Sequence, residues 1–182
     1  MQSVNRAQQL AASLDLSSGL SLNFLPTTLD TLPDAISSTL EAAERCGIPA
    51  ASLILEISEG EVIENPARFA AKINAFRASG LRFAIDDFGA GYAGLNLLCE
   101  FQPDIVKLDM ALVRDIDIKG PRQAIAKAVL QVCNDLGLEV VAEGVETEAE
   151  FQWLARRQVT LFQGYLFGEP LLGKMGQPVY PG

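Results

Sequence analysis

Two adjacent carboxylates, Asp86 and Asp87, directly follow an apolar run in the segment RFAIDDFGAGYAGL, which covers residues 82–95. Burying unpaired charge in a core strand is costly, so this pair needs a partner or a task. Consecutive strand residues point to opposite faces, and the two aspartates can share a site only if the strand ends there. The continuation FGAGYAG predicts such an ending, because Gly89 and Gly91 are free to bend the chain.

Further polar residues interrupt the apolar runs at comparable points. Together with the first aspartate they are Asn23, Glu56, Asp86, Lys107, Glu143 and Gln163. One aspartate of the pair can bridge two cations while Glu56 and Glu143 complete the two sites and Asn23 adds a neutral oxygen. Two metals about 3.5–4 Å apart activate a water molecule and stabilise the leaving oxygen of an in-line displacement at phosphorus. Lys107 can stabilise phosphate charge or orient that water.

The composition favours a hard divalent cation over other catalytic machinery. The chain contains no histidine, which excludes Ser-His and Cys-His nucleophile pairs and zinc sites with histidine ligands. Oxygen ligands select Mg²⁺ or Mn²⁺ rather than zinc. The 14 basic and 23 acidic residues give a net charge of −9, so we expect no broad groove for DNA. A small anionic ligand can still bind through metal cations.

Each of these residues also has a structural interpretation. A pair of aspartates before a turn is commonly a helix cap or a turn element. Glu56 can be the partner in a buried ion pair, and Lys107 can pair with Asp109 on its own strand face. Lys107 can also form a Schiff base with a carbonyl substrate, although surrounding carboxylates would keep its amine protonated.

Two further glutamates have open assignments. Glu146 follows Glu143 after a tight glycine turn, and it either faces the same site or caps the helix that begins near Thr147. Glu59 lies one turn beyond Glu56, where fixing a loop suits it as well as ligation does. Six apolar runs are interrupted, most of them by carboxylates, and like charges gathered at one place repel without cations. This coincidence favours a metal site over separate explanations.

The segments that must position these side chains alternate along the sequence between short β-rich runs and helical patterns. The runs lie at residues 20–24, 52–57, 82–85, 104–108, 139–142 and 159–162. The expected helical stripes are Phe69, Ile73 and Phe76 in one helix, and Ile125, Val129, Val132 and Leu136 in another. Thr147 and Glu150 form a candidate capping box for a third helix. Gly47, Gly80 and Gly137 stand where helices should end before the next strand.

This alternation predicts an α/β fold with a parallel sheet, and the polar strand ends favour closure into a barrel. In a (β/α)₈ barrel the carboxyl ends of the strands converge on one mouth, whereas an open sheet would spread six ends over roughly 24 Å. Six units fall short of eight, so we expect a TIM-like (β/α) barrel with about six of its eight strands. We expect one domain at residues 1–172 and a loose C-terminal tail at 173–182.

The composition also indicates a globular protein of the cytoplasm. Apolar residues make up 49% of the chain, no apolar run reaches the roughly 18 residues of a membrane span, and the start lacks the pattern of a signal peptide. Cys46, Cys99 and Cys133 are odd in number, far apart and without a C-x-x-C pair. We therefore expect three reduced thiols in the core.

Taken together, these segments resemble the EAL domain family of cyclic di-GMP phosphodiesterases. In order they are SLNFLP, LILEISEG, FAIDDFGAGYAGL, DIVKLD, VVAEGVET and LFQGYLFGEP, and the resemblance runs from residue 1 to about residue 172. The resemblance implies a TIM-like barrel of bacterial signalling that hydrolyses cyclic di-GMP to linear pGpG with Mg²⁺ or Mn²⁺. It also implies partners: cyclic di-GMP, and either a second copy in a homodimer or a regulatory domain.

The resemblance further implies a role for each residue. Asn23, Glu56 and Asp86 would bind one metal, and Asp86, Asp87 and Glu143 the second. Lys107, Glu143 and Glu59 would be the catalytic residues, and Glu146, Gln163 and Asp109 would contact substrate. Lys107 would hold or activate the water. Glu59 would anchor the loop after DDFG, which the family ties to dimerisation and metal binding.

The chain departs from the family in one large respect. It contains no Glu-Ala-Leu tripeptide, whose glutamate is a metal ligand in the family, and no arginine following it to hold substrate. We expect the family's opening strands and first helix to be missing with it. The chain is then either a fragment of a larger protein or is completed by dimerisation, strand exchange or a partner. Two hypotheses follow: a phosphodiesterase domain impaired by truncation, or a non-catalytic module that binds cyclic di-GMP or a protein.

Overall fold

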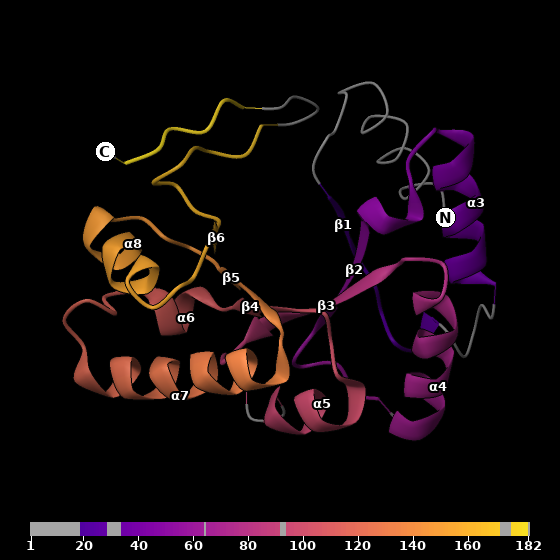
Figure 1. The fold of residues 1–182 in the computed structure, drawn as a ribbon, viewed down its shortest axis with the longest axis horizontal. Helices are drawn as coiled ribbons and strands as arrows, with labels where there is room; N and C mark the ends of the chain where they lie inside the picture. The colour runs from indigo at the N-terminus through magenta and orange to yellow at the C-terminus, as the bar shows by residue number, and fades with distance from the viewer. Residues whose placement is uncertain (1–18, 29–33, 64, 92–93, 172–175, 182) are drawn as a thin grey trace.

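The computed structural model describes residues 19–28, 34–63, 65–91, 94–171 and 176–181, and Figure 1 shows its six strands in one curled sheet. The strands are β1 (Leu20–Asn23), β2 (Leu53–Ser58), β3 (Arg82–Phe88), β4 (Ile105–Leu108), β5 (Glu139–Ala142) and β6 (Leu161–Phe162). All are parallel, and their order in the sheet is their order in the chain. Every predicted run contains a strand, and the curl confirms the predicted incomplete barrel.

Helices follow the strands and cover the outside of the curl (Figure 1). They are α3 (Ala35–Arg45), α4 (Pro66–Arg77), α5 (Gly94–Phe101), α6 (Met110–Val113), α7 (Gly120–Leu136) and α8 (Glu148–Ala155), with a 3₁₀ turn η1 (Ala50–Ser52) before β2. The helices α3 and α4 lie beside β1 and β2, whereas α6, α7 and α8 lie beside β4 to β6. This arrangement leaves the concave face of the sheet and its strand ends for function.

The predicted helical stripes are confirmed in α4 and displaced in α7. In α4, Phe69 and Ile73 are buried. In α7 the buried residues are Ala126, Val129 and Cys133, whereas Ile125 and Leu136 of the predicted stripe are more than half exposed. Small side chains let α7 approach β5 closely, so packing selects alanine and cysteine over the more apolar residues beside them. Hydropathy alone therefore misplaced the buried face.

The cysteines also differ from the expectation. All three are free, but only Cys133 is buried; Cys46 is half-buried and Cys99 is exposed on α5. Burial raises the pKa of the Cys133 thiol to about 11, so this thiol stays protonated in the core. The interpretation as core thiols therefore holds for Cys133 alone.

The two outer strands of the sheet each have an open edge. Among the residues that the structure describes, β1 and β6 each pair along one edge only. Open edges of this kind are available for pairing with further strands.

No helix in the described part of the chain has the length and apolarity needed to cross a membrane. The predicted domain boundary at residue 172 lies outside the described residues.

Candidate metal and active site

The parallel register brings the predicted strand-end residues to one edge of the sheet. Asn23 at the end of β1 pairs with Glu56 of β2, and Ser58 pairs with Asp86 of β3. Glu143 follows β5 directly, and its N–H donates to the Leu108 carbonyl of β4 at 3.1 Å. The carboxyl ends of neighbouring strands therefore meet, as the barrel prediction required.

Lys107 of β4 lies at the centre of this edge. Its Nζ is 2.8 Å from Asp86 Oδ1, 2.8 Å from Glu143 Oε1 and 3.1 Å from Glu56 Oε2. Lys107 and Glu56 are each only 8% exposed, so these ion pairs are desolvated. The alternative pairing of Lys107 with Asp109 is wrong. Asp109 has left the strand and caps α6, where its Oδ1 accepts the Ala111 N–H at 2.7 Å.

The electrostatics of Lys107 and Glu143 follow from this geometry. Burial by itself lowers the pKa of Lys107, but hydrogen bonds to Asp86 and Glu143 and the charges of Glu143 and Glu56 outweigh it, and the pKa rises above its ordinary value. Burial raises the pKa of Glu143 to about 7, although Lys107 opposes the shift. A lysine with a raised pKa stays protonated, which argues against the Schiff-base alternative.

Asp86 and Asp87 lie near the end of β3 and share the edge through a kink, and the strand ends directly before Gly89, as predicted. Strand β3 continues to Phe88, and its register against β4 shifts between Ile85 and Phe88. At that point Asp87 has a φ of 56°, in the left-handed region that non-glycine residues rarely adopt. Asp87 is held there by its own N–H, which donates to Asp86 Oδ1, and by the Ser58 hydroxyl, which donates to Asp87 Oδ2, both at 3.0 Å.

A divalent cation fits the donor set that results. One carboxylate oxygen each from Asp86, Asp87 and Glu143 lies within 4.8 Å of the other two. Glu56 joins this group through Lys107, which also pairs with Asp86 and Glu143. All these donors are hard oxygens, as Mg²⁺ and Mn²⁺ prefer. Asn23 is exposed beside Glu56, and its side chain makes no hydrogen bond to any residue that the structure describes.

Glu59 holds a loop: its backbone N–H donates to the Asp86 carbonyl at 2.9 Å, but its carboxylate binds the loop and none of the cluster's side chains. It is 3% exposed, and its carboxylate accepts the backbone N–H of Gly89, Gly91 and Gly94 at 2.7, 3.2 and 2.8 Å. A Cβ at Gly91 would lie 3.2 Å from Glu59 Oε1, and one at Gly94 would lie 2.6 Å from the Phe88 ring. Both close approaches explain the glycines. The structure gives Glu59 the loop-fixing role of the two that the sequence left open.

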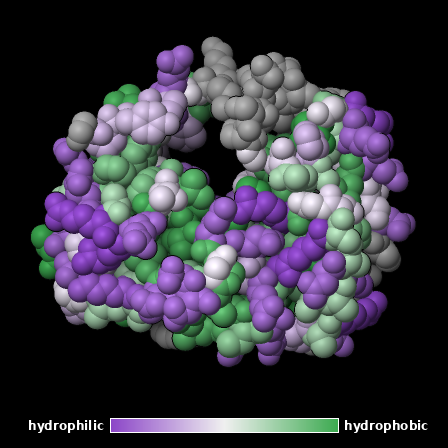
Figure 2. Space-filling model, in the orientation of Figure 1, coloured by the Kyte–Doolittle hydropathy of each residue, from purple (hydrophilic) through white to green (hydrophobic). Residues whose placement is uncertain are grey.

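A cleft of about 540 Å³ lies beside the cluster. Its lining brings together five of the predicted residues: Asp87, Asp109, Glu143, Glu146 and Gln163. The turn between Glu143 and Glu146 depends on Gly144, where φ is 64° and a Cβ would lie 2.5 Å from Met110 Cβ. Figure 2 shows this face of the molecule hollowed between its β1 side and its β6 side.

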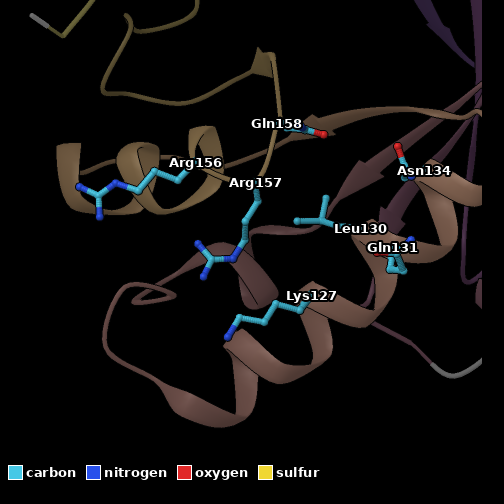
Figure 3. Close-up of a pocket in the computed structure, with 7 residues that line it drawn as sticks. All are labelled: Lys127, Leu130, Gln131, Asn134, Arg156, Arg157 and Gln158. Carbon is cyan, nitrogen blue, oxygen red and sulfur yellow. The ribbon is translucent and has the colours of Figure 1, made fainter.

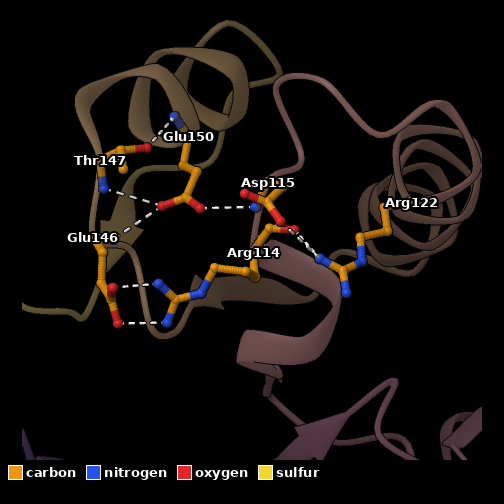
Figure 4. Close-up of polar contacts among 6 residues, drawn as sticks. All are labelled: Arg114, Asp115, Arg122, Glu146, Thr147 and Glu150. Atoms are coloured by element: carbon orange, nitrogen blue, oxygen red, sulfur yellow. Dashed lines mark hydrogen bonds and ion pairs between the residues drawn. The ribbon is translucent and has the colours of Figure 1, made fainter.

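Glu146 does not cap α8. The N-cap is Thr147, which forms the predicted capping box with Glu150, while the Glu146 carboxylate binds the guanidinium of Arg114 through two hydrogen bonds (Figure 4). The hydrogen bond from Arg114 lowers the pKa of Glu146. Glu150 is 1% exposed, and its carboxylate also accepts the N–H of Asp115 at 2.8 Å.

Arg114 and this second role of Glu150 escaped the sequence interpretation. The capping box was visible because its residues are close in sequence. The Arg114–Glu146 and Asp115–Glu150 contacts join residues 32 and 35 positions apart, and no local pattern predicts them.

Comparisons with known proteins agree on one family. A model described as "EAL domain" matches residues 1–170. The chain is 40% identical over 162 residues to the blue light- and temperature-regulated antirepressor BluF of Escherichia coli, covering 89% of this chain and 40% of BluF. It is 37% identical over 117 residues to the cyclic di-GMP phosphodiesterase PdeR of the same organism, covering 64% of this chain and 18% of PdeR.

The solved structure of a manganese and cyclic di-GMP complex of BlrP1 from Klebsiella pneumoniae superposes with a TM-score of 0.91 and 43% identity. That match covers 99% of this chain and 47% of the BlrP1 chain. The chain therefore spans less than half the length of each of these relatives.

Proposed function

The chain belongs to the EAL domain family, and on that premise we propose that it binds cyclic di-GMP and hydrolyses it to linear pGpG. The observation that carries the proposal is the convergence of the Asp86, Asp87 and Glu143 carboxylates at the mouth of the barrel, where Lys107 pairs with Asp86 and Glu143. The relative PdeR is named a cyclic di-GMP phosphodiesterase, and BlrP1 has been solved with manganese and cyclic di-GMP.

The carboxylates are the metal-binding groups in this proposal. Asp86, Asp87 and Glu143 would hold one divalent cation, and Glu56, with Asn23 beside it, would extend the donor set toward a second. A bound cation would activate a water molecule and offset charge on the phosphate. The fit rests on the donor atoms: four carboxylates and one lysine carry a charge of −3 when every carboxylate is ionised, and a cation favours that ionised form, including that of Glu143.

Lys107 acts as a charged hydrogen-bond donor. Despite burial, its pKa is raised by Asp86, Glu143 and Glu56, so it is protonated in the metal-free site. It can hold that water by a hydrogen bond and stabilise charge that develops on the phosphate oxygens. Its three carboxylate partners fix Nζ in place, so little reorganisation is needed during the reaction.

The cleft supplies the substrate contacts. Guanine presents N–H donors that carboxylates accept, and Glu146 and Asp109 line the cleft with Gln163. Glu59 acts as a positioning residue, because it ties the loop after Asp87 to the end of β2.

Hydrolysis by the purified chain tests the proposal. We expect cyclic di-GMP to be converted to linear pGpG with Mn²⁺ or Mg²⁺, and Asp86→Asn to lower the rate by at least about 100-fold. The matched control Asp135→Asn, an exposed carboxylate on α7, should retain the rate. A folded chain that gives no product at high concentration, or an Asp86→Asn variant of full activity, would contradict the assignment.

A non-catalytic module is the second candidate, and one observation favours it. The relative BluF is named an antirepressor. This candidate predicts that calorimetry detects cyclic di-GMP binding with metal while chromatography detects no product. Absence of both binding and turnover would leave a protein-interaction role.

The setting of the domain is part of the proposal. We place residues 1–172 as the domain and 173–182 as its tail, acting in the cytoplasm, where three free cysteines would stay reduced. Its partners would be a second copy in a homodimer or a regulatory domain, since the relatives extend well beyond the region that this chain matches.

A further inference from the structure

A cleft of about 320 Å³ lies between α7 and the end of α8, away from the residues assigned above (Figure 3). Three cations line it, Lys127, Arg156 and Arg157, and its lining contains no acidic residue. None of the three forms an ion pair with a carboxylate in the described part of the chain. On a chain of net charge −9, this cleft is a local concentration of unneutralised positive charge.

Arg157 is held ready for an anion. Its guanidinium carbon lies 3.4 Å from the centre of the Trp153 ring, and its Nη1 donates to the Trp153 carbonyl at 2.6 Å. Figure 3 shows Arg157 and Lys127 extending toward the same side of the cleft. A guanidinium that is already stacked loses less conformational freedom on binding, and its other N–H groups remain available.

The rest of the lining suits a peptide better than a single compact anion. Arg156 points away from Lys127 and Arg157 in Figure 3, so the positive charges are not gathered at one point. Side-chain amides of Gln131, Asn134 and Gln158 line the cleft beside them and offer both donors and acceptors for a peptide backbone. Gln131 is oriented by its Nε2, which donates to Asp135 at 2.7 Å. Leu130 adds a half-buried apolar contact.

The cleft lies at the opposite end of the barrel from the carboxylate cluster. Its residues come from the last turns of α7 and from the end of α8, just before β5 and β6 begin. The cluster is formed at the other ends of the strands, where Glu143 follows β5. In barrels of this kind the amino ends of the strands are not where substrate is turned over. The positive charge therefore needs an explanation other than the reaction.

We propose that the α7–α8 cleft is a docking site for an acidic peptide segment of a protein partner. Charge complementarity favours an acidic ligand, because the lining of the cleft contains three cationic side chains and no carboxylate.

Binding of a fluorescein-labelled oligoglutamate peptide tests the site. We expect fluorescence anisotropy at low salt to detect binding, and Lys127→Glu or Arg156→Glu to weaken it about fivefold each. The matched control is Arg45→Glu, which makes the same charge change at an exposed arginine of α3 and should leave the affinity unchanged. Amide chemical shifts of the wild-type protein should change at residues 127–134 and 156–158.

The outcomes discriminate sharply. Equal weakening by Arg45→Glu would show a non-specific charge effect, and absence of peptide binding or shifts confined to other residues would also overturn the site. Tripolyphosphate binding tighter than the peptide at the same residues would assign the cleft to a phosphate ligand and overturn the peptide proposal. Cyclic di-GMP hydrolysis is a separate readout, which Lys127→Glu should leave unchanged.

Discussion

The structure contains two groups of charged residues, and they differ in whether the charges within each group balance. The strand-end cluster consists of Glu56, Asp86, Asp87, Glu143 and Lys107, whose charge is −3 when all four carboxylates are ionised. The loop network consists of Arg114, Asp115, Lys119, Arg122, Glu146 and Glu150, whose net charge is zero; Figure 4 draws all of them except Lys119. The first is incomplete without a cation, whereas the second is complete within the chain.

Burial makes the contrast more informative. Lys107 and Glu56 are each 8% exposed, whereas the pairs of the loop network lie mostly at the surface. Unbalanced charge is tolerated at the surface, but in a desolvated place it is expensive and persists where function requires it. The loop network instead fixes the positions of backbone segments around the cleft, so its members should affect stability and geometry more than chemistry.

Replacing Lys107, the only basic side chain of the strand-end cluster, should have the largest effect on stability. Lys107→Met leaves buried carboxylates without a partner, and we expect the metal-free protein to lose about 3–5 kcal/mol of unfolding free energy. Mn²⁺ should then raise the melting temperature of this variant by more than it raises that of the wild type. Urea unfolding with chelator and with Mn²⁺ measures both. An unchanged metal-free stability would remove the distinction between the two groups.

Glu150 is the buried member of the loop network, and its loss should rank second. Its carboxylate accepts the N–H of Asp115, Glu146 and Thr147 at 2.8–3.0 Å. Burial raises the pKa of Glu150, but these hydrogen bonds outweigh it and lower the pKa. We expect Glu150→Gln to cost about 2 kcal/mol at neutral pH. Glu148→Gln, an exposed neighbour on the same helix turn, is the control.

The pH dependence of Glu150 has a definite sign. Because the folded pKa is depressed, the stabilisation is present above the ordinary pKa of 4.5 and is lost as pH falls from there through the lower folded value. Unfolding free energies measured from neutral to acid pH should therefore fall less steeply for Glu150→Gln than for the wild type. Parallel curves would mean that the carboxylate charge contributes nothing.

Replacing Arg114 should affect substrate binding in the cleft more than it affects the stability of the fold. The Arg114 and Glu146 side chains are 37% and 38% exposed, so we expect Arg114→Ala to change the unfolding free energy by less than about 1 kcal/mol. Releasing the Glu146 carboxylate adds unpaired negative charge to the cleft, which should raise KM for cyclic di-GMP while kcat changes less. Arg45→Ala is the matched control. A fall in kcat with constant KM would place Arg114 in the chemistry instead.

The strand-end cluster could be predicted from the sequence, whereas the loop network could not. Polar interruptions of apolar runs are local signals, and a parallel sheet brings them to one edge whatever the details of packing. The kink at Asp87 depends on how β3 pairs with β4, and the partner of Arg114 lies 32 residues away, so neither has a local signal. Proximity in sequence also misled: Asp109 is two residues from Lys107 but turns away to cap α6.

Replacing Lys119 should give the smallest loss of stability, and it provides a reference for the loss caused by replacing Lys107. Its Nζ is 2.5 Å from Asp115 Oδ2, four residues before it, and the two side chains are 48% and 42% exposed. Solvent and salt screen such a pair, so Lys119→Met should cost only about 0.3–0.5 kcal/mol. Because Lys107→Met makes the same chemical change in a desolvated place, the ratio of the two losses in urea unfolding measures what burial contributes. Similar losses for the two variants would mean that the strand-end carboxylates relax into solvent, and the case for a metal-requiring cluster would fail with them.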